Sequence, residues 1–128
     1  AVPADSTAMH LVGNEPHCPT GSWDLIHGAV HHAKEIGQEL HVGPIVSSDL
    51  FYNPDDGQYE RWSKRGVLAV EMETSALFTI GALRGVEAGC LLIVSDIVVE
   101  GEFTRISDED MRTAVDRMTR VALEVATS

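Results

Sequence analysis

Positively charged residues are scarce in this sequence. It has nine lysines and arginines against 20 aspartates and glutamates, which gives a formal net charge of −11 over 128 residues. A chain of this charge is repelled by the phosphate backbone of nucleic acids and by anionic membrane surfaces. We therefore expect neither nucleic acids nor membranes among its partners.

Cysteine is also rare, and it does not occur in a metal-binding pattern. Cys18 and Cys90 lie far apart, and neither belongs to a CxxC motif or to the paired spacing of a zinc site. Secreted domains of small size often carry several disulfides, whereas proteins of reducing compartments keep their thiols. The sequence thus predicts two free thiols and a cytoplasmic location.

Long hydrophobic runs are missing as well, and we expect no secretion signal. The longest apolar runs, such as CLLIV, are far shorter than the roughly 20 residues that cross a membrane. The first residues show no basic-then-apolar leader. Hydrophobic residues make up 44% and charged residues 23%, which is typical of a globular protein, and the length suits one domain. We expect a single α/β domain over residues 1–128, for the reasons that follow.

Hydrophobic periodicity predicts helices and strands in alternation. After an apolar start and a loop up to residue 19, we expect helices at residues 22–37, 57–66, 74–85 and 107–126, and strands at residues 40–48, 67–72 and 88–98. Residues 100–105 are expected to form a loop. Strands that are apolar throughout and alternate with helices are typical of α/β folds. The sequence predicts a central sheet, largely parallel or mixed, flanked by helices.

The last of these helices has the clearest signature. Ser107 is a good N-cap residue, and the acidic residues at 108–110 suit the positive end of the helix dipole. Apolar residues then recur at helical spacing and form one stripe. We expect this helix to be amphipathic, with the stripe facing the core.

Carboxylates follow two of the predicted strands. LAV is followed by EME, with Glu71 and Glu73, and LLIV is followed by Ser95 and Asp96. In an open α/β sheet, ligands bind beyond the carboxyl ends of the parallel strands. The helix at residues 74–84 has the length of a crossover between neighbouring parallel strands. If the two strands are such neighbours, the three carboxylates lie at one rim of the sheet and form a candidate site.

These carboxylates also have alternative interpretations. Glu71 and Glu73 fit an acidic pair that the dipole favours at a helix start, and Asp96 fits a turn or cap residue after a strand. The three could together hold a metal ion, but no further ligand spacing supports this. The histidines of the helix at 22–37 lack an HExxH motif and a third ligand, so we expect solvated or half-buried side chains there.

Three stretches of the sequence resemble the nucleoside phosphorylase family, in particular the branch of hexameric purine nucleoside phosphorylases and uridine phosphorylases. They are AVPADST at residues 1–7, HVGPIVSSDLFYNPD at 41–55 and GVLAVEMETSALFTIGALRGVEAGCLLIVSD at 66–96. The last stretch holds the most specific patterns, V-E-M-E at a strand end and V-S-D one helix later. The resemblance covers nearly the whole chain and about the C-terminal half of a family member. It implies a nucleoside phosphorylase type of α/β fold that is truncated at the N-terminus.

The resemblance also implies an activity. Family members carry out phosphorolysis, in which a nucleoside and phosphate give a free base and a pentose 1-phosphate. Phosphate is the nucleophile and co-substrate, so neither a metal nor an organic cofactor is implied. Such enzymes form homo-oligomers built from dimers, and the half that is not matched here normally carries the phosphate site.

Five residues are assigned to nucleoside binding by the resemblance. Met72 and Glu73 correspond to residues that grip the ribose, with the Glu73 carboxylate accepting hydrogen bonds from its hydroxyls. That carboxylate also lies near the anomeric carbon, where positive charge develops. Val70 and Glu71 correspond to the backbone and side wall beside the base. Phe51, which could otherwise be a core aromatic, corresponds to the residue that packs on the face of the base.

The catalytic role falls to Asp96 by the resemblance. It corresponds to the general acid that faces N7 of a purine and lets the base leave neutral, and Ser95 orients this region. Hexameric purine-acting members place an arginine after this aspartate to assist it. The corresponding position is Met111, with Arg105 and Arg112 nearby, so the identity of the assisting residue stays open.

The base and the catalytic competence stay open too. The Ser-Asp pair at 95–96 is similar to purine-acting members, whereas uridine-acting members read the base with a glutamine and an arginine in a loop. The loop after Phe51 holds Gln58 and Arg61 but is short. A further interpretation is a truncated, non-catalytic relative that binds a nucleoside or a partner subunit.

Overall fold

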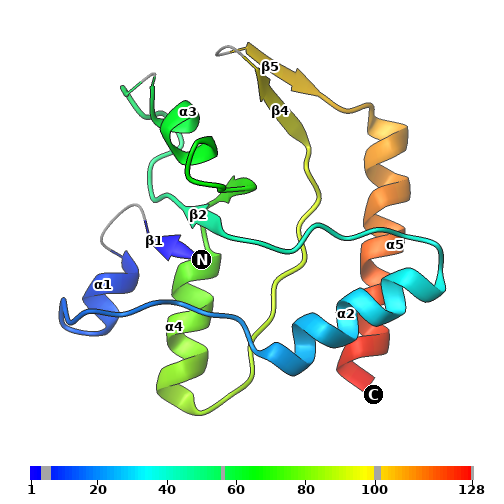
Figure 1. The fold of residues 1–128 in the computed structure, drawn as a ribbon, viewed down its shortest axis with the longest axis horizontal. Coiled ribbons are helices and arrows are strands. Elements are labelled where there is room, and N and C mark those ends of the chain that lie inside the picture. Colours follow the sequence, from blue (N-terminus) through cyan, green and yellow to red (C-terminus); the bar gives the residue numbers. More distant parts are fainter. Residues whose placement is uncertain (4–6, 56, 100–101, 128) are drawn as a thin grey trace. The chain divides into compact units, whose positions relative to one another are not determined.

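The computed structural model describes residues 1–3, 7–55, 57–99 and 102–127, which form helices and strands mixed along the chain (Figure 1). The strands are β1 (Val2–Pro3), β2 (Ile45–Ser47), β3 (Ala69–Glu71), β4 (Asp96–Val99) and β5 (Glu102–Arg105). The helices are α1 (Thr7–Leu11), α2 (Trp23–Glu35), α3 (Gln58–Ser63), α4 (Thr74–Arg84) and α5 (Asp108–Thr127). No helix within the described ranges is long and apolar enough to cross a membrane.

The contacts within the chain divide it into two compact units. The first unit holds Ala1–Trp23 and His41–Cys90, which include β1, α1, β2, α3, β3 and α4. The second unit holds Asp24–Leu40 and the chain from Leu91 onward, which include most of α2 and all of β4, β5 and α5. A compact unit defined by contacts need not fold alone, so a single domain over residues 1–128 stays a prediction.

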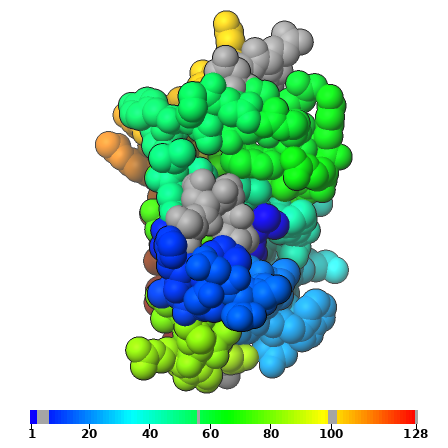
Figure 2. Space-filling model, turned by 90° about the vertical axis from the view of Figure 1, so that its left-hand side faces the viewer, coloured from blue at the N-terminus to red at the C-terminus, as the bar shows by residue number. Residues whose placement is uncertain are grey.

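The first unit is built on a parallel sheet. β2 lies between β1 and β3, with Val46 opposite both Val2 and Val70. Val46 is only 1% exposed, as expected for a central strand. α4 packs against β2, and α1 packs against β1 and α4 (Figure 1). Figure 2 shows the blue α1 beside the light green α4. A parallel sheet flanked by helices confirms the predicted α/β class.

The end of α4 follows from its sequence. Gly85 adopts a left-handed conformation, with φ 63° and ψ 33°, which costs glycine little. The N–H of Gly85 donates to the carbonyl of Ala82 at 3.3 Å, and the N–H of Val86 donates to that of Gly81 at 2.9 Å. These bonds satisfy carbonyls at the helix end, and they confirm the predicted stop at residue 85.

The second unit has a core between two helices. Ala29 and Ala33 of α2 pack with Val121 of α5, and Leu91 and Val125 are among the apolar residues around them. Ser107 caps α5 as predicted, because its Oγ accepts the N–H of Asp110 at 3.1 Å and donates to the carboxylate of Asp110 at 2.7 Å. The antiparallel strands β4 and β5 precede this helix.

The strand expected at residues 88–98 differs from the prediction. β4 begins only at Asp96, and residues 86–95 belong to no helix or strand. A strand requires a hydrogen-bonded partner, and in the described part of the chain that partner is β5. The expected loop at 100–105 is therefore wrong for Glu102–Arg105, which form β5. Residues 100–101 of that stretch lie outside the described residues.

Two further expectations are corrected. The two carboxylates do not follow parallel neighbouring strands. Glu71 ends β3, which pairs in parallel with β2, whereas Asp96 begins β4, which pairs antiparallel with β5 in a separate sheet. Apolar runs indicate strands but do not specify which strands pair. The expected loop before residue 19 contains α1, whose five residues are too few for a periodic signal. Residues 4–6 of AVPADST lie outside the described residues.

Candidate functional site

The start of α4 is organised by the side chain of Glu71. The chain leaves β3 at this residue and turns through Met72 and Glu73 into the helix. Glu71 Oε2 accepts the N–H of Glu73 at 2.7 Å and the N–H of Thr74 at 2.6 Å. A helix start leaves such N–H groups without intrahelical partners, and a carboxylate there also suits the helix dipole. The interpretation of an acidic pair at a helix start therefore holds for Glu71.

Ser47 joins this helix start to the central strand. Its hydroxyl donates to Glu71 Oε1, and its Oγ accepts the N–H of Ser75 at 2.8 Å. The residues in this network are well buried, with exposed fractions of 3% for Ser47, 2% for Thr74 and 6% for Ser75. Buried polar groups of this kind are costly when they lack partners, so the network ties β2, β3 and α4 together.

The pKa of Glu71 is set by two opposing effects. Burial raises it, because removal from water disfavours the charged form. Hydrogen bonds from the side chains of Ser47 and Thr74 and from the backbone N–H groups lower it, and together they leave the pKa below its ordinary value of 4.5. Glu71 is therefore a carboxylate that the fold keeps ionised.

Glu71→Gln should weaken the acid sensitivity of the fold. A pKa that is lowered on folding gives Glu71 a stabilising contribution that is complete above the unfolded-state pKa and is lost as the pH falls through the folded-state pKa. The free energy of unfolding, measured by denaturant titration from about pH 7 to about pH 3, should fall more steeply in the wild type than in the variant. Equal slopes in the two proteins would contradict this assignment.

Glu73 and Met72 differ from Glu71 in their exposure. Glu73 is the N-cap residue of α4, but its side chain makes no capping hydrogen bond, and the residue is exposed. Met72 is 38% exposed and Val70, on β3, is 40% exposed. The turn thus presents a carboxylate, a thioether and an apolar side chain to the solvent, which suits a ligand with hydroxyls and an apolar face.

The loop after β2 presents aromatic side chains. Phe51 is 70% exposed and Tyr52 is 90% exposed, and their rings meet edge to face with centroids 5.0 Å apart. The alternative that Phe51 is a core aromatic is therefore wrong. Thr7 of α1 donates through both its N–H, at 3.2 Å, and its hydroxyl to Asp49 Oδ2, which ties this loop to α1.

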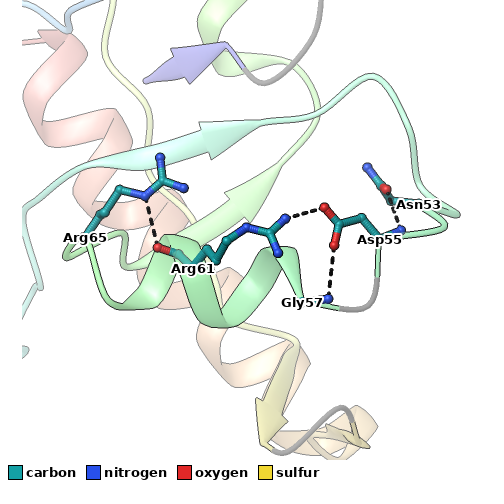
Figure 3. A network of polar contacts seen from close by, with 5 residues as sticks. All are labelled: Asn53, Asp55, Gly57, Arg61 and Arg65. Carbon is teal, nitrogen blue, oxygen red and sulfur yellow. Dashed lines mark hydrogen bonds and ion pairs between the residues drawn. The ribbon is translucent and has the colours of Figure 1, made fainter.

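The next part of the loop forms its own polar network (Figure 3). Arg61 of α3 donates to Asp55 Oδ2, and Asp55 Oδ1 accepts the N–H of Gly57 at 3.2 Å. The Arg61 guanidinium beside Asp55 lowers the pKa of that carboxyl. Gln58, the other candidate base-reading residue, is only 7% exposed. Arg61 and Gln58, the two candidates for reading a uracil base, thus contribute to the local structure.

Ser95 and Asp96 both lie in the second unit. Ser95 Oγ donates to Asp96 Oδ2 at 2.6 Å, and the carbonyl of Ser95 accepts the N–H of Ile106 at 2.9 Å. Both residues are half-buried. The β4–β5 register places Arg105 directly opposite Asp96, whereas Met111 lies in the first turn of α5. Directly opposed residues are neighbours on one face of an antiparallel pair, so Arg105 is the better candidate to assist Asp96.

The predicted residues form two groups. Phe51, Val70, Glu71, Met72 and Glu73 belong to the first unit, whereas Ser95 and Asp96 belong to the second. Within the described ranges, no group of three histidines, cysteines or acidic residues is arranged to hold a metal ion. His31 and His32 of α2 instead meet Glu35 of the same helix. Cys18 and Cys90 form no disulfide.

Sequence reasoning missed Ser47 and Thr74 as parts of the site. Both are hydroxyl residues next to a strand end or a helix start, where Ser and Thr side chains commonly bond to backbone groups. That local signal was present in the sequence. The pairing of Ser47 with Glu71 was not, because 24 residues separate them.

The sequence matches the family model described as "Phosphorylase superfamily" over residues 4–127. It is 44% identical over 108 residues to a curated relative, "Purine nucleoside phosphorylase DeoD-type" of Clostridium novyi (strain NT). The aligned residues make up 84% of this chain and 46% of the relative. The proteins of the same name from Caldanaerobacter subterraneus subsp. tengcongensis and Geobacillus stearothermophilus are 44% identical over 110 residues and 42% identical over 114 residues. These matches cover 86% and 89% of this chain, and 47% of each relative. The chain spans about half the length of the curated relatives it matches.

Proposed function

This chain belongs to the phosphorylase superfamily, and we propose that it carries the nucleoside-binding part of a purine nucleoside phosphorylase. The reaction is phosphorolysis of a purine nucleoside to the free base and a pentose 1-phosphate. Three relatives named as purine nucleoside phosphorylases match most of the chain at 42% to 44% identity. The proposal concerns the activity of the whole protein of which such a part is a component.

The exposed carboxylate of Glu73 is the observation that carries the proposal. It lies at the start of α4, where the helix makes no use of it, and beside it Met72 is partly exposed. A carboxylate accepts strong hydrogen bonds from two adjacent hydroxyls, such as those of ribose. We assign Glu73 to the ribose hydroxyls and Met72 to the apolar face of the sugar.

The base is assigned to the exposed apolar groups of the same unit. Phe51 offers a ring face for stacking, and Val70 offers an apolar wall beside the turn. Glu71 lies beside Val70, but both its side-chain oxygens accept hydrogen bonds within the fold. Its contact with the base is therefore assigned to its backbone.

Asp96 is assigned as the general acid. An oxygen of hydrogen phosphate attacks the anomeric carbon, the bond from that carbon to N9 breaks, and its electron pair goes to the purine. Asp96 gives a proton to N7, so the base leaves neutral, and the proton that hydrogen phosphate loses balances the transfer. Ser95 holds Oδ2 at 2.6 Å and so orients the carboxyl, while Arg105 lies opposite on β5.

A purine is favoured over uridine by the loop after Phe51. Arg61 is engaged by Asp55, and Gln58 is buried in α3. Neither is therefore presented for reading the edge of a pyrimidine. This agrees with the Ser95–Asp96 pair, whose proposed role requires a base with an acceptor at N7.

The remaining assignments follow from the same chemistry. Phosphate is proposed as the co-substrate, and because it is itself the nucleophile, the reaction requires neither a metal nor an organic cofactor. We also propose a cytoplasmic homo-oligomer built from dimers. Its partners are then the nucleoside, phosphate and further copies of the protein.

Glu73→Gln should weaken the binding of inosine about tenfold, because a neutral amide accepts weaker hydrogen bonds than a carboxylate. The same substitution should leave the binding of 2′,3′-dideoxyinosine unchanged, since that compound lacks the two hydroxyls. Both Kd values are measured by titration calorimetry.

Glu87→Gln is the control, because Glu87 is an exposed acid of the same unit. It removes the same charge and should not alter either Kd. If Glu73→Gln weakened both ligands equally, the assignment of Glu73 to the ribose hydroxyls would be rejected.

A further inference from the structure

We propose that Glu71 is a positioning residue whose side chain contacts no ligand. Its side chain fixes the turn that presents Glu73, and its bond with Ser47 together with its backbone carbonyl fixes the end of β2, from which the chain continues to Phe51. This inference rests on the proposed function only for what those two segments bind. The arrangement itself follows from hydrogen bonds within the fold.

On the sugar side, the carboxylate holds the turn directly. Glu71 Oε2 accepts the N–H groups of Glu73 and Thr74, at 2.7 Å and 2.6 Å. These two bonds fix the backbone of Glu73 relative to the end of β3. Because Glu73 makes no side-chain capping bond of its own, Glu71 takes the capping role and leaves the neighbouring carboxylate for a ligand.

On the base side, Glu71 acts through the end of β2. Its carbonyl accepts the N–H of Ser48 at 2.9 Å, which extends the β2–β3 pairing by one residue. The Oγ of Ser48 in turn donates to the carbonyl of Leu50 at 3.1 Å and accepts its N–H at 3.3 Å. Leu50 directly precedes Phe51, so the position of the aromatic ring depends on the same residue.

The network requires a carboxylate, because its donors approach both side-chain oxygens. Ser47 donates to Oε1 while two N–H groups donate to Oε2. A glutamine has one side-chain oxygen, so it accepts on one side and presents its NH₂ group to the other. Its amide would then meet either the hydroxyl of Ser47 or the two backbone donors, and the buried network would rearrange.

These contacts separate the roles of the two glutamates. Both oxygens of Glu71 are occupied by groups of the fold, and the hydroxyl residues of this network, Ser47, Thr74 and Ser75, are at most 6% exposed. Glu73 is exposed, and its carboxylate makes no capping hydrogen bond. One carboxylate therefore builds the turn, and the other is presented by it.

The test compares Glu71→Gln and Ser47→Ala with wild type and with the Glu87→Gln control. The first readout is the set of backbone amide signals in a ¹H–¹⁵N spectrum, followed as the pH is lowered. In the wild type, the signals of Glu73 and Thr74 should titrate together with a midpoint below the ordinary glutamate value, since both amides bond to one carboxylate. Glu71→Gln should abolish this titration, and the control should retain it.

The second readout separates positioning from mere stability. Inosine binding is measured well below the unfolding temperature of each variant, so that all protein is folded. Glu71→Gln should weaken binding about tenfold, and Ser47→Ala should weaken it in the same direction, because the segments that bind the ligand are displaced. A residue that only stabilised the fold would lower the unfolding temperature and leave the Kd of the folded protein unchanged.

Each outcome decides between the alternatives. An unchanged Kd in folded Glu71→Gln, or amide signals of residues 72–75 that do not respond to this substitution, would overturn the proposal. If wild-type protein bound no inosine, the proposed function would fail by itself. The positioning role of Glu71 would then be judged by the amide signals alone. If Glu71 positions these segments, the signals of residues 50–52 and 72–75 should shift in Glu71→Gln. Unshifted signals would reject the role.

Discussion

Asp96→Asn should lower the rate of purine phosphorolysis by about 10²- to 10⁴-fold in any form of the protein that turns over. Asparagine keeps the size of the side chain and an oxygen that accepts the Ser95 hydroxyl, but it has no proton to give to N7. The purine would then have to leave as an anion. The measurement is the steady-state release of hypoxanthine from inosine and phosphate.

Asp116→Asn serves as the matched control for this substitution. Asp116 lies on α5 in the same unit, its side chain is 63% exposed, and it pairs with Arg120 on the surface. Exposed ion pairs of this kind contribute little, so the control should retain full activity. Unchanged turnover in Asp96→Asn would contradict the role of Asp96 as the general acid.

Phe78→Ala should lower the free energy of unfolding by about 3 to 5 kcal/mol, which is the usual cost of removing a buried aromatic side chain. Phe78 lies on α4 and is only 8% exposed. Its neighbour Thr79 is fully buried and bonds through its hydroxyl to the carbonyl of Ser75 at 2.7 Å. This face of α4 is therefore packed, and a cavity there would also loosen the helix whose start presents Glu73.

Leu83→Ala tests whether burial, and not residue type, determines that loss. Leu83 lies on the same helix but is 58% exposed. Its truncation should change the free energy of unfolding by well under about 1 kcal/mol, as is usual for surface substitutions. Denaturant titration of both variants makes the comparison. Equal losses would show that the packing of α4 is not as described.

The helices other than α1 could be predicted well because their signals are local. Ser107 caps α5 through an N–H three residues away, and Gly85 ends α4 through carbonyls of its own last turn. The apolar spacing that indicated these helices likewise depends only on neighbouring residues. Each prediction therefore needed no knowledge of the rest of the chain.

Strand pairing could not be predicted in the same way. The apolar run before Asp96 looked like a buried strand, but the strand observed begins at Asp96 and pairs with residues that had been expected to form a loop. Pairing depends on which segments meet in space, and hydrophobicity alone does not encode this. The condition for a shared rim of three carboxylates, two parallel neighbouring strands, is not met for that reason.

The candidate site shows the same limit at the level of single residues. The sequence placed two glutamates where a strand meets a helix, and that location is confirmed. The different roles of Glu71 and Glu73 depend on Ser47, which lies 24 residues earlier and reaches Glu71 only in the folded chain. Only the hydrogen bonds of the folded chain distinguish Glu71, which stabilises the fold, from Glu73, which we propose for the ligand.

The most direct test of the central claim is release of free base from inosine, adenosine, methylthioadenosine and uridine, with and without phosphate. We expect release that depends on phosphate and occurs with purine nucleosides but not with uridine. Phosphate-dependent release from uridine alone would contradict the assigned base. Absence of release from all four by folded protein would contradict the proposed catalysis and favour a non-catalytic binding protein.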